Sequence, residues 1–180
     1  AIAVALAFAM PAAAHDQTYP VAGDSILVQT DQGPGTEVFQ FVARGGDKPT
    51  IYLQGGIHAG EIDGKDAGFW FLRDLLDGKV APGALDAVNI VFVPVINPDG
   101  HERFGPNNRP NQRGPAEMGF RTNGARLNIN RDFVKADTPE MQALLGVVRS
   151  VDPIVFVDLH ATDGAKFGRD IAVLVGTGGP

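Results

Sequence analysis

Short, almost wholly apolar runs alternate along this chain with segments of helical periodicity, and this alternation limits the fold more than any other feature. Apolar runs occupy residues 49–56, 87–96 and 153–160, and helical periodicity occupies residues 64–79 and 138–151. Strands that are apolar throughout are typical of sheets covered on both faces. The chain is therefore expected to have an α/β fold, three layers deep (α/β/α), with a central mixed, largely parallel sheet.

Local signals refine this prediction. Residues 25–30 and 37–43 read as two strands joined by a Gly/Pro turn, and residues 171–176 read as a further strand. Thr138 is expected to cap the second helix, with Pro139 at its first position. The predicted apolar stripes of the two helices are Ala67, Phe71, Leu72, Leu75 and Leu76, and then Met141, Leu144, Leu145 and Val148.

The two ends of the chain carry different signals. With 180 residues, 44% of them hydrophobic, the chain is long enough for one domain with its own core. Residues 1–14 form an apolar run closed by small residues, which is typical of the remnant of a signal peptide cleaved after Ala14. Residues 15–180 are then the domain of a secreted or periplasmic protein with no stable membrane span. Since the chain stops just after a strand, this domain is expected to be incomplete at its C-terminus.

The charge pattern excludes one class of partner. The formal charge of −6 and the isoelectric point near 5.1 argue against a protein that binds nucleic acid. Six of the ten arginines nevertheless lie within residues 97–131, a segment that contains no lysine. This segment belongs to a stretch of about forty residues with little periodicity, and loops of that length are usually functional or disordered.

Several catalytic chemistries are excluded by composition. The chain has no cysteine, and neither of its serines, Ser25 and Ser150, lies in a G-x-S-x-G turn. It also lacks a G-x-x-x-x-G-K-[ST] phosphate loop and a G-x-G-x-x-G motif after a strand. Histidine and carboxylate chemistry therefore remain as the main possibilities.

Three residues are candidates for a metal site. His58 and His160 each follow a predicted strand, and Glu61 lies three positions after His58. Because ligands gather beyond the carboxyl ends of parallel strands, these side chains are expected to converge. Two imidazoles and one carboxylate form an open zinc site that leaves a coordination position free. The alternative is that the histidines are hydrogen-bonded structural residues at strand ends.

The arginine-rich segment supplies candidates for binding an anion. They are Arg121 and the pair Asn130 and Arg131, and the pair lies between apolar Ile129 and Phe133 where the chain returns toward the core. Arginine binds carboxylates through a bidentate fork and stabilises a developing oxyanion. The remaining arginines of the segment are predicted to be solvated loop residues: Arg103, Arg109, Arg113 and Arg126.

Five short motifs occur in an order that resembles the zinc carboxypeptidase family of the carboxypeptidase A/B type. They are "HAGE", "NPDGHERF", "FR", "NINRDF" and "DLH", and they extend from the first predicted metal ligands to His160. The resemblance implies an α/β/α fold with zinc bound by His58, Glu61 and His160. It also implies that Arg121 polarises the scissile carbonyl, and that Asn130 and Arg131 hold the terminal carboxylate of a peptide substrate.

The chain departs from the family pattern at several points. Asn128 stands where an acid of the family often supports a zinc-bound histidine, and an amide raises the basicity of that histidine less than a carboxylate would. Asp158, two positions before His160, is a candidate to compensate as a hydrogen-bond acceptor, and the alternative is that it is a buried structural acid. Asp132 follows Arg131 where asparagine is common, and its charge is expected to weaken binding of a substrate anion. The residues after His160 contain neither the glutamate general base nor the tyrosine of the family. This absence indicates a fragment.

The leading functional prediction is therefore a secreted or periplasmic zinc metallopeptidase that hydrolyses C-terminal peptide bonds by metal-activated water. Its substrate would be a peptide with a free C-terminal carboxylate, and a peptide of the cell wall is one version of it. One alternative is a zinc-dependent deacylase or amidohydrolase of the desuccinylase type, which uses the same ligands on an N-acyl amino acid. The other is a metal- or peptide-binding protein without turnover.

Overall fold

A four-stranded mixed sheet forms the centre of the protein. The computed structural model describes residues 27–29, 37–39, 41–43, 48–112, 114–162 and 173. The sheet has the strand order β3-β5-β4-β6, in which β3 is antiparallel to β5 and the other pairs are parallel. The bounds of the strands are Phe41–Ala43 (β3), Thr50–Gly55 (β4), Asn89–Val93 (β5) and Val155–Leu159 (β6).

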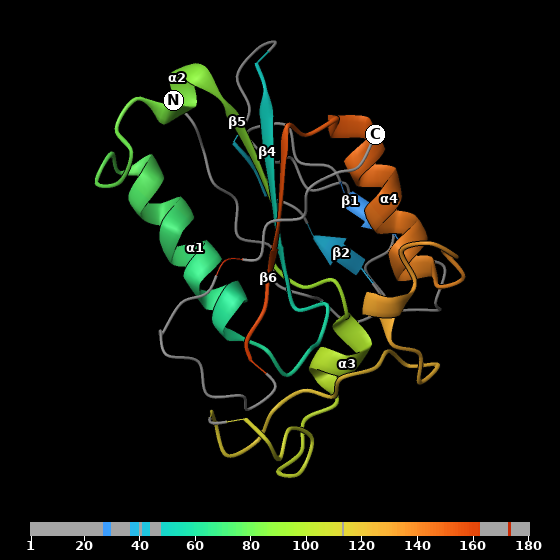
Figure 1. Ribbon diagram of the computed structural model, residues 1–180. Helices are drawn as coiled ribbons and strands as arrows, with labels where there is room; N and C mark the ends of the chain where they lie inside the picture. The colour runs from blue at the N-terminus through green and yellow to red at the C-terminus, as the bar shows by residue number, and fades with distance from the viewer. Residues whose placement is uncertain are drawn as a thin grey trace.

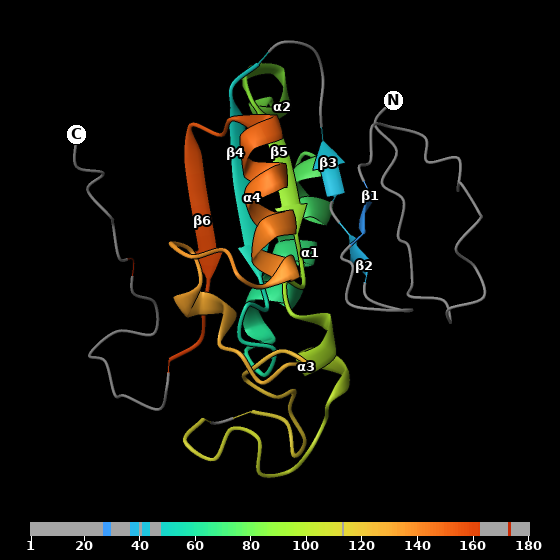
Figure 2. The ribbon, with the colours of Figure 1, turned by 90° about the vertical axis from the view of Figure 1, so that its right-hand side faces the viewer.

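Two helices cover opposite faces of this sheet. Helix α1 (Asp63–Leu76) packs on one face and α4 (Pro139–Val151) on the other, as Figures 1 and 2 show. The predicted three-layer α/β fold with a mixed, largely parallel sheet is therefore confirmed. A separate antiparallel pair consists of β1 (Leu27–Gln29) and β2 (Glu37–Phe39), which lie within the two predicted N-terminal strands. The second prediction, residues 37–43, is only partly correct, because this stretch is divided between β2 and strand β3 of the central sheet.

Some sequence predictions lie outside the described residues. They concern the signal remnant at residues 1–14, its cleavage after Ala14, and the strand at residues 171–176. Within the described residues, β6 is an edge strand of the sheet, and its Phe156 is 41% exposed. No helix in the described part of the chain has the length and apolar character needed to cross a membrane.

Side chains alternate between two hydrophobic cores because successive residues of a strand point to opposite faces. Tyr52, Val91 and Val93 face α4, where they join the cluster that contains Met141 and Leu144. On the other face, Ile90 and Phe92 pack with Leu72 and Leu75 of α1. Strands β4 and β5 are thus packed between two apolar layers, as their nearly continuous apolar runs predicted, whereas β6 is exposed or only partly buried.

Helix α4 begins as predicted. The Thr138 hydroxyl oxygen accepts a hydrogen bond from the Met141 amide at 3.3 Å, and Pro139 occupies the first turn. The predicted stripe is buried at Met141 and Leu144 and partly buried at Leu145 and Val148, with Val147 completing the buried face.

The predicted stripe of α1 is only partly correct. Leu72 and Leu75 are buried, but Ala67 and Phe71 are exposed. The buried face is completed by glycine, since a Cβ at Gly68 would overlap the ring of Phe92. The helix approaches the sheet too closely for a side chain at position 68, and Phe71 lies outside the buried face. An apolar periodicity that scores glycine as neutral misses this contact.

Gly68→Ala is expected to destabilise the protein by about 1–3 kcal/mol, because the added methyl group must displace the buried Phe92 ring. Gly146→Ala is the matched control, since Gly146 lies in α4 with nothing within 4 Å of an added Cβ. That change is expected to stabilise the protein by about 0.5–1 kcal/mol through helix propensity. Urea denaturation of both variants checks the opposite signs, and two changes of the same sign would contradict this account.

The irregular segment between β5 and α4 is held in place by side-chain to backbone hydrogen bonds. It contains helix α3 (Pro98–Glu102) and a 3-10 turn, η2 (Ile129–Arg131), and the short helix α2 (Ala84–Ala87) precedes β5. The Asn97 side chain caps α3 by accepting from the Gly100 amide at 2.9 Å. The Asn123 side chain accepts from the Leu127 amide at 2.8 Å. The predicted aperiodic stretch is therefore a structured loop.

The buried acid Glu140 holds this loop through a hydrogen bond to Asn123. Glu140 of α4 is 1% exposed and accepts a hydrogen bond from the Asn123 amide group at 3.2 Å. Burial raises the pKa of the Glu140 carboxyl above its ordinary value, and the nearby Asp99 and Asp132 add to the increase. The loop that carries Arg121, Asn130 and Arg131 is thus tied to the core of the fold.

Candidate metal centre

Two neighbouring strands deliver the two candidate histidines to the same edge of the sheet. Strands β4 and β6 are parallel, with Gly55 opposite Leu159 at their carboxyl ends. His58 follows β4 after a short turn, and His160 follows β6 directly. The turn continues to Glu61, whose amide donates to the His58 carbonyl at 2.9 Å. This turn brings the Glu61 carboxylate back toward the end of β6.

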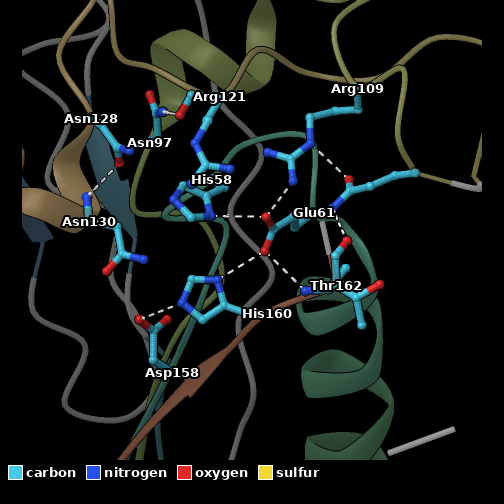
Figure 3. A network of polar contacts seen from close by, with 12 residues as sticks. His58, Glu61, Asn97, Arg109, Arg121, Asn128, Asn130, Asp158, His160 and Thr162 are labelled. Carbon is cyan, nitrogen blue, oxygen red and sulfur yellow. Dashed lines mark hydrogen bonds and ion pairs between the residues drawn. The ribbon is translucent and has the colours of Figure 1, made fainter. Parts of the chain in front are cut away.

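The three side chains meet through their polar atoms (Figure 3). His58 Nδ1 lies 2.9 Å from Glu61 Oε1, and His160 Nδ1 lies 2.9 Å from Glu61 Oε2. The two imidazole rings have centroids 5.1 Å apart. One potential ligand atom from each residue lies within 4.8 Å of the other two. The structure therefore brings His58, Glu61 and His160 together as predicted, although their roles as metal ligands stay a prediction.

Glu61 is a buried carboxylate with four hydrogen-bonding neighbours. Besides the two histidines, Arg109 donates through Nη2 to Oε1 at 2.6 Å, and the Ala161 amide donates to Oε2 at 3.0 Å. Burial alone would raise the pKa of Glu61, but the hydrogen bonds from His160 and His58 outweigh it and hold this pKa well below its ordinary value. The carboxylate is therefore ionised at neutral pH, as a metal ligand must be.

This donor set fits a zinc ion. Zinc prefers imidazole nitrogen and carboxylate oxygen, and three protein ligands are typical of catalytic sites. His58 is 4% exposed and Glu61 is 3% exposed, whereas the His160 side chain is 33% exposed. One side of the cluster therefore faces solvent, which leaves room for a substrate to reach an ion held there.

Asp158 contacts the second nitrogen of His160, in agreement with the compensation expected from its position. Its Oδ2 lies 3.0 Å from His160 Nε2, and Asp158 lies in β6 two positions before His160, which follows the strand directly. Hydrogen bonds to Asp158 and then to Glu61 raise the pKa of His160 to about 9. An acceptor on Nε2 favours the tautomer that leaves Nδ1 as the ligand nitrogen when a metal is bound.

Asn128 does not take the supporting role considered for it. Its side-chain oxygen accepts from the Asn130 amide at 3.1 Å and caps η2. His58 Nε2 is buried and has no hydrogen-bond partner among the described residues. Histidine support in this part of the structure therefore comes from Asp158 on His160.

The Asp132 carboxylate lies at the start of α4, and its effect on the binding of a substrate anion stays a prediction. Asp132 is 7% exposed, and its carboxylate accepts from the Thr138 amide and hydroxyl, each at 2.7 Å. It also accepts from the Asp137 amide at 3.0 Å. Burial tends to raise the pKa of Asp132, but these hydrogen bonds have the larger effect and hold it below its ordinary value. Its carboxylate is therefore held by hydrogen-bond donors at the start of α4.

The three candidate substrate-binding residues lie in the loop beside the histidines. The Arg121 carbonyl accepts from the Asn97 side chain at 3.3 Å, and the Arg121 side chain points toward the histidines in Figure 3. Arg131 is exposed and donates through Nη1 to the Asn130 carbonyl at 2.9 Å. Four of its five N–H donors are left for other partners.

Arg109 contradicts the prediction that it is a solvated loop residue. It is 8% exposed and bonds directly to Glu61, forty-eight residues away in the chain. Its aliphatic part fits because residue 60 is glycine, where a Cβ would lie 2.6 Å from Arg109 Cγ. No periodicity signals such a contact, and only the glycine within "HAGE" could have indicated that another side chain fills this space.

The other arginines of the segment have separate outcomes. Arg103 and Arg126 are exposed, as predicted, and the Arg103 guanidinium lies 4.4 Å from the centre of the Phe120 ring. Arg113 lies outside the described residues. His101 lies on α3, where its ring contacts Phe104 and hydrogen-bonds to the Ala59 backbone, and it is not one of the three clustered residues.

Comparison with known proteins agrees with this geometry. The zinc carboxypeptidase family matches residues 21–165. A carboxypeptidase B from Helicoverpa zea is 33% identical over 94 residues, which cover 49% of this chain and 21% of that protein. The chain thus spans about a fifth of the length of this relative.

Solved structures show the same fold at low identity. A metallo-carboxypeptidase from Pseudomonas aeruginosa, in complex with (2-guanidinoethylmercapto)succinic acid, superposes with a TM-score of 0.56 at 20% identity, over 78% of this chain and 35% of that one. An aspartoacylase family protein from Mesorhizobium loti gives 0.52 at 17% identity, over 76% and 38%. The fold is thus shared by proteins of both names. The extent of the family match establishes that this chain belongs to the zinc carboxypeptidase family.

Proposed function

We propose that this chain is part of a zinc metallocarboxypeptidase, which removes C-terminal residues from peptides by hydrolysis. The observation that carries the proposal is the convergence of His58 Nδ1 and His160 Nδ1 on the buried carboxylate of Glu61. These three residues would hold the zinc ion. A bound zinc ion would polarise the scissile carbonyl and lower the pKa of water for attack.

The residues of the adjacent loop have complementary roles in this proposal. Arg121, whose side chain points toward the histidines, donates hydrogen bonds to the carbonyl oxygen as negative charge develops on it. Asn130 and Arg131 bind the terminal carboxylate of the peptide through an amide and a guanidinium. Both groups sit on η2, which is capped by Asn128, so their backbone is fixed before substrate arrives.

The proposed location is secreted or periplasmic, on the basis of the apolar leader at residues 1–14. The proposed substrate is a peptide with a free C-terminal carboxylate. Deacylation of an N-acyl amino acid is the alternative, because the fold is shared with an aspartoacylase family protein and a zinc ion held here would also activate water for amide hydrolysis. The pair Asn130 and Arg131 favours the peptidase.

Assay of the full-length protein tests the proposal. We expect release of the C-terminal amino acid from a set of unblocked peptides. The release should fall by at least about a hundredfold after removal of metal with a chelator and return on addition of zinc, since the metal supplies the chemistry. N-succinyl and N-acetyl amino acids serve as the comparison substrates. Hydrolysis of these alone would favour the deacylase, and metal binding without any hydrolysis would indicate a binding protein.

A further inference from the structure

Arg109 makes the shortest of the contacts to the central carboxylate of the metal cluster. Its Nη2 lies 2.6 Å from Glu61 Oε1, and the side chains of both residues are about 95% or more removed from solvent. Glu61 Oε2 is held from the other side by the Ala161 amide at 3.0 Å. These two donors are distinct from the histidine nitrogens, so they can remain in place when the histidines turn their Nδ1 lone pairs to a metal.

The same arginine is linked to the second ligand-bearing segment. Its Nε donates to Gln112 Oε1 at 2.8 Å, and the Gln112 side-chain amide donates to the carbonyl of Thr162. A backbone hydrogen bond from the Gln112 amide to the Arg109 carbonyl, at 3.1 Å, closes the turn between the two residues. Figure 3 shows Arg109 and Thr162 on either side of Glu61.

The turn formed by Arg109 and Gln112 therefore connects the segment after β4 with the segment after β6. One end contacts Glu61, in the turn after β4, and the other contacts the chain two residues beyond His160. The fit depends on Gly60, because a Cβ there would collide with Arg109 Cγ at 2.6 Å and with the Gly119 carbonyl at 2.7 Å. Glycine at position 60, next to Glu61, thus leaves space for the Arg109 side chain.

We propose that Arg109 and Gln112 are positioning residues that brace the metal centre, with Arg109 orienting the Glu61 carboxylate and Gln112 fixing the segment after His160. The inference rests on the proposed zinc site. A planar guanidinium that bonds Glu61 through one nitrogen and Gln112 through another fixes the direction of the carboxylate as well as its charge. Outer partners of this kind hold metal ligands in their binding orientation.

The positive charge of Arg109 offers an alternative, in which it repels the zinc ion instead of helping Glu61 to bind it. Arg109 would then lower zinc affinity by repulsion, and its loss would raise that affinity. The brace predicts the reverse, because Arg109 is paired with Glu61 and its main effect is on the direction of this ligand. Arg109→Lys separates the two roles, since lysine keeps the charge but cannot reproduce the planar fork.

Zinc affinity of the full-length protein, measured by competition with a chromophoric chelator, tests the brace. We expect the dissociation constant to rise about 10- to 100-fold in Arg109→Met, and to rise in Arg109→Lys as well. Gln112→Ala is expected to show a smaller increase. Arg103→Met is the matched control from the same loop, because Arg103 is exposed and lies over Phe120 rather than Glu61. Its affinity should equal that of the unaltered protein.

The visible absorption spectrum of the cobalt-substituted protein gives a second measurement, which a purely structural role would not change. We expect Arg109→Met and Arg109→Lys to shift the Co²⁺ bands and Arg103→Met to leave them unchanged. Circular dichroism checks that each variant is folded, and Arg109→Lys decides the matter if Arg109→Met does not fold. Unchanged or tighter zinc binding in folded Arg109 variants would overturn the brace while leaving the zinc site intact. Absence of zinc binding in the unaltered protein would instead overturn the proposed function.

Discussion

Replacing His58 or His160 by alanine is expected to lower the zinc content of the purified protein from about one ion per chain to less than about a tenth of that, because only two protein ligands remain. The structure makes this effect large, since the two Nδ1 atoms both face the single carboxylate of Glu61 at 2.9 Å. No other group of three candidate ligands lies close together among the described residues. Atomic absorption after dialysis against a buffer with trace zinc gives the measurement.

His101→Ala is the matched control for this experiment. His101 is a partly buried histidine on α3, and its pKa is lowered by burial and by the nearby Lys65. It is not one of the three candidate ligands, but it hydrogen-bonds to the backbone of Ala59, in the turn that carries His58 and Glu61. Its replacement therefore tests for an indirect effect on this turn and should leave most of the zinc in place. Equal loss of zinc in all three variants would indicate a general effect on folding. Unchanged zinc content in both cluster variants would remove the basis for a zinc enzyme.

The fold could be predicted from the sequence because its signals are local. The apolar run at residues 49–56 became β4, and Thr138 with Pro139 began α4 as expected. Convergence of His58 and His160 also followed from a local rule, since each histidine comes after a strand and parallel strands end at the same edge.

The environment of the metal cluster could not be predicted in the same way. Arg109 reaches Glu61 across forty-eight residues, through an irregular loop whose path depends on hydrogen bonds such as those of Asn108 to the Arg103 and Met118 carbonyls. The spacing of residues in the sequence does not predict the path of such a loop. The hydrogen bonds between Asp132 and the start of α4 were also not predicted, because the position of Asp132 beside Arg131 in the chain does not indicate them.

Peptides with a free C-terminus are expected to be cleaved by the full-length protein at least about a hundredfold more efficiently, in kcat/KM, than the same peptides with an amidated C-terminus. The reason is the loss of charge-assisted hydrogen bonds from Asn130 and Arg131, which are worth about 1.5–3 kcal/mol each. Arg131→Met should reduce kcat/KM for the free peptides by a similar factor and leave the amidated peptides nearly unaffected. Competition between paired free and amidated substrates, followed by mass spectrometry, measures both ratios.

Arg126→Met provides the control for Arg131, since both arginines are exposed in the same loop and Arg126 lies outside the capped turn η2. Loss of Arg126 should leave the ratio between free and amidated peptides unchanged. A clamp formed by Arg131 requires that its guanidinium, now bonded to the Asn130 carbonyl at 2.9 Å, turns its remaining donors to the substrate carboxylate. Equal cleavage of both peptides by the unaltered protein would show that Asn130 and Arg131 do not read the C-terminus. The substrate would then be recognised through its side chains or its acyl group, as in the deacylase alternative.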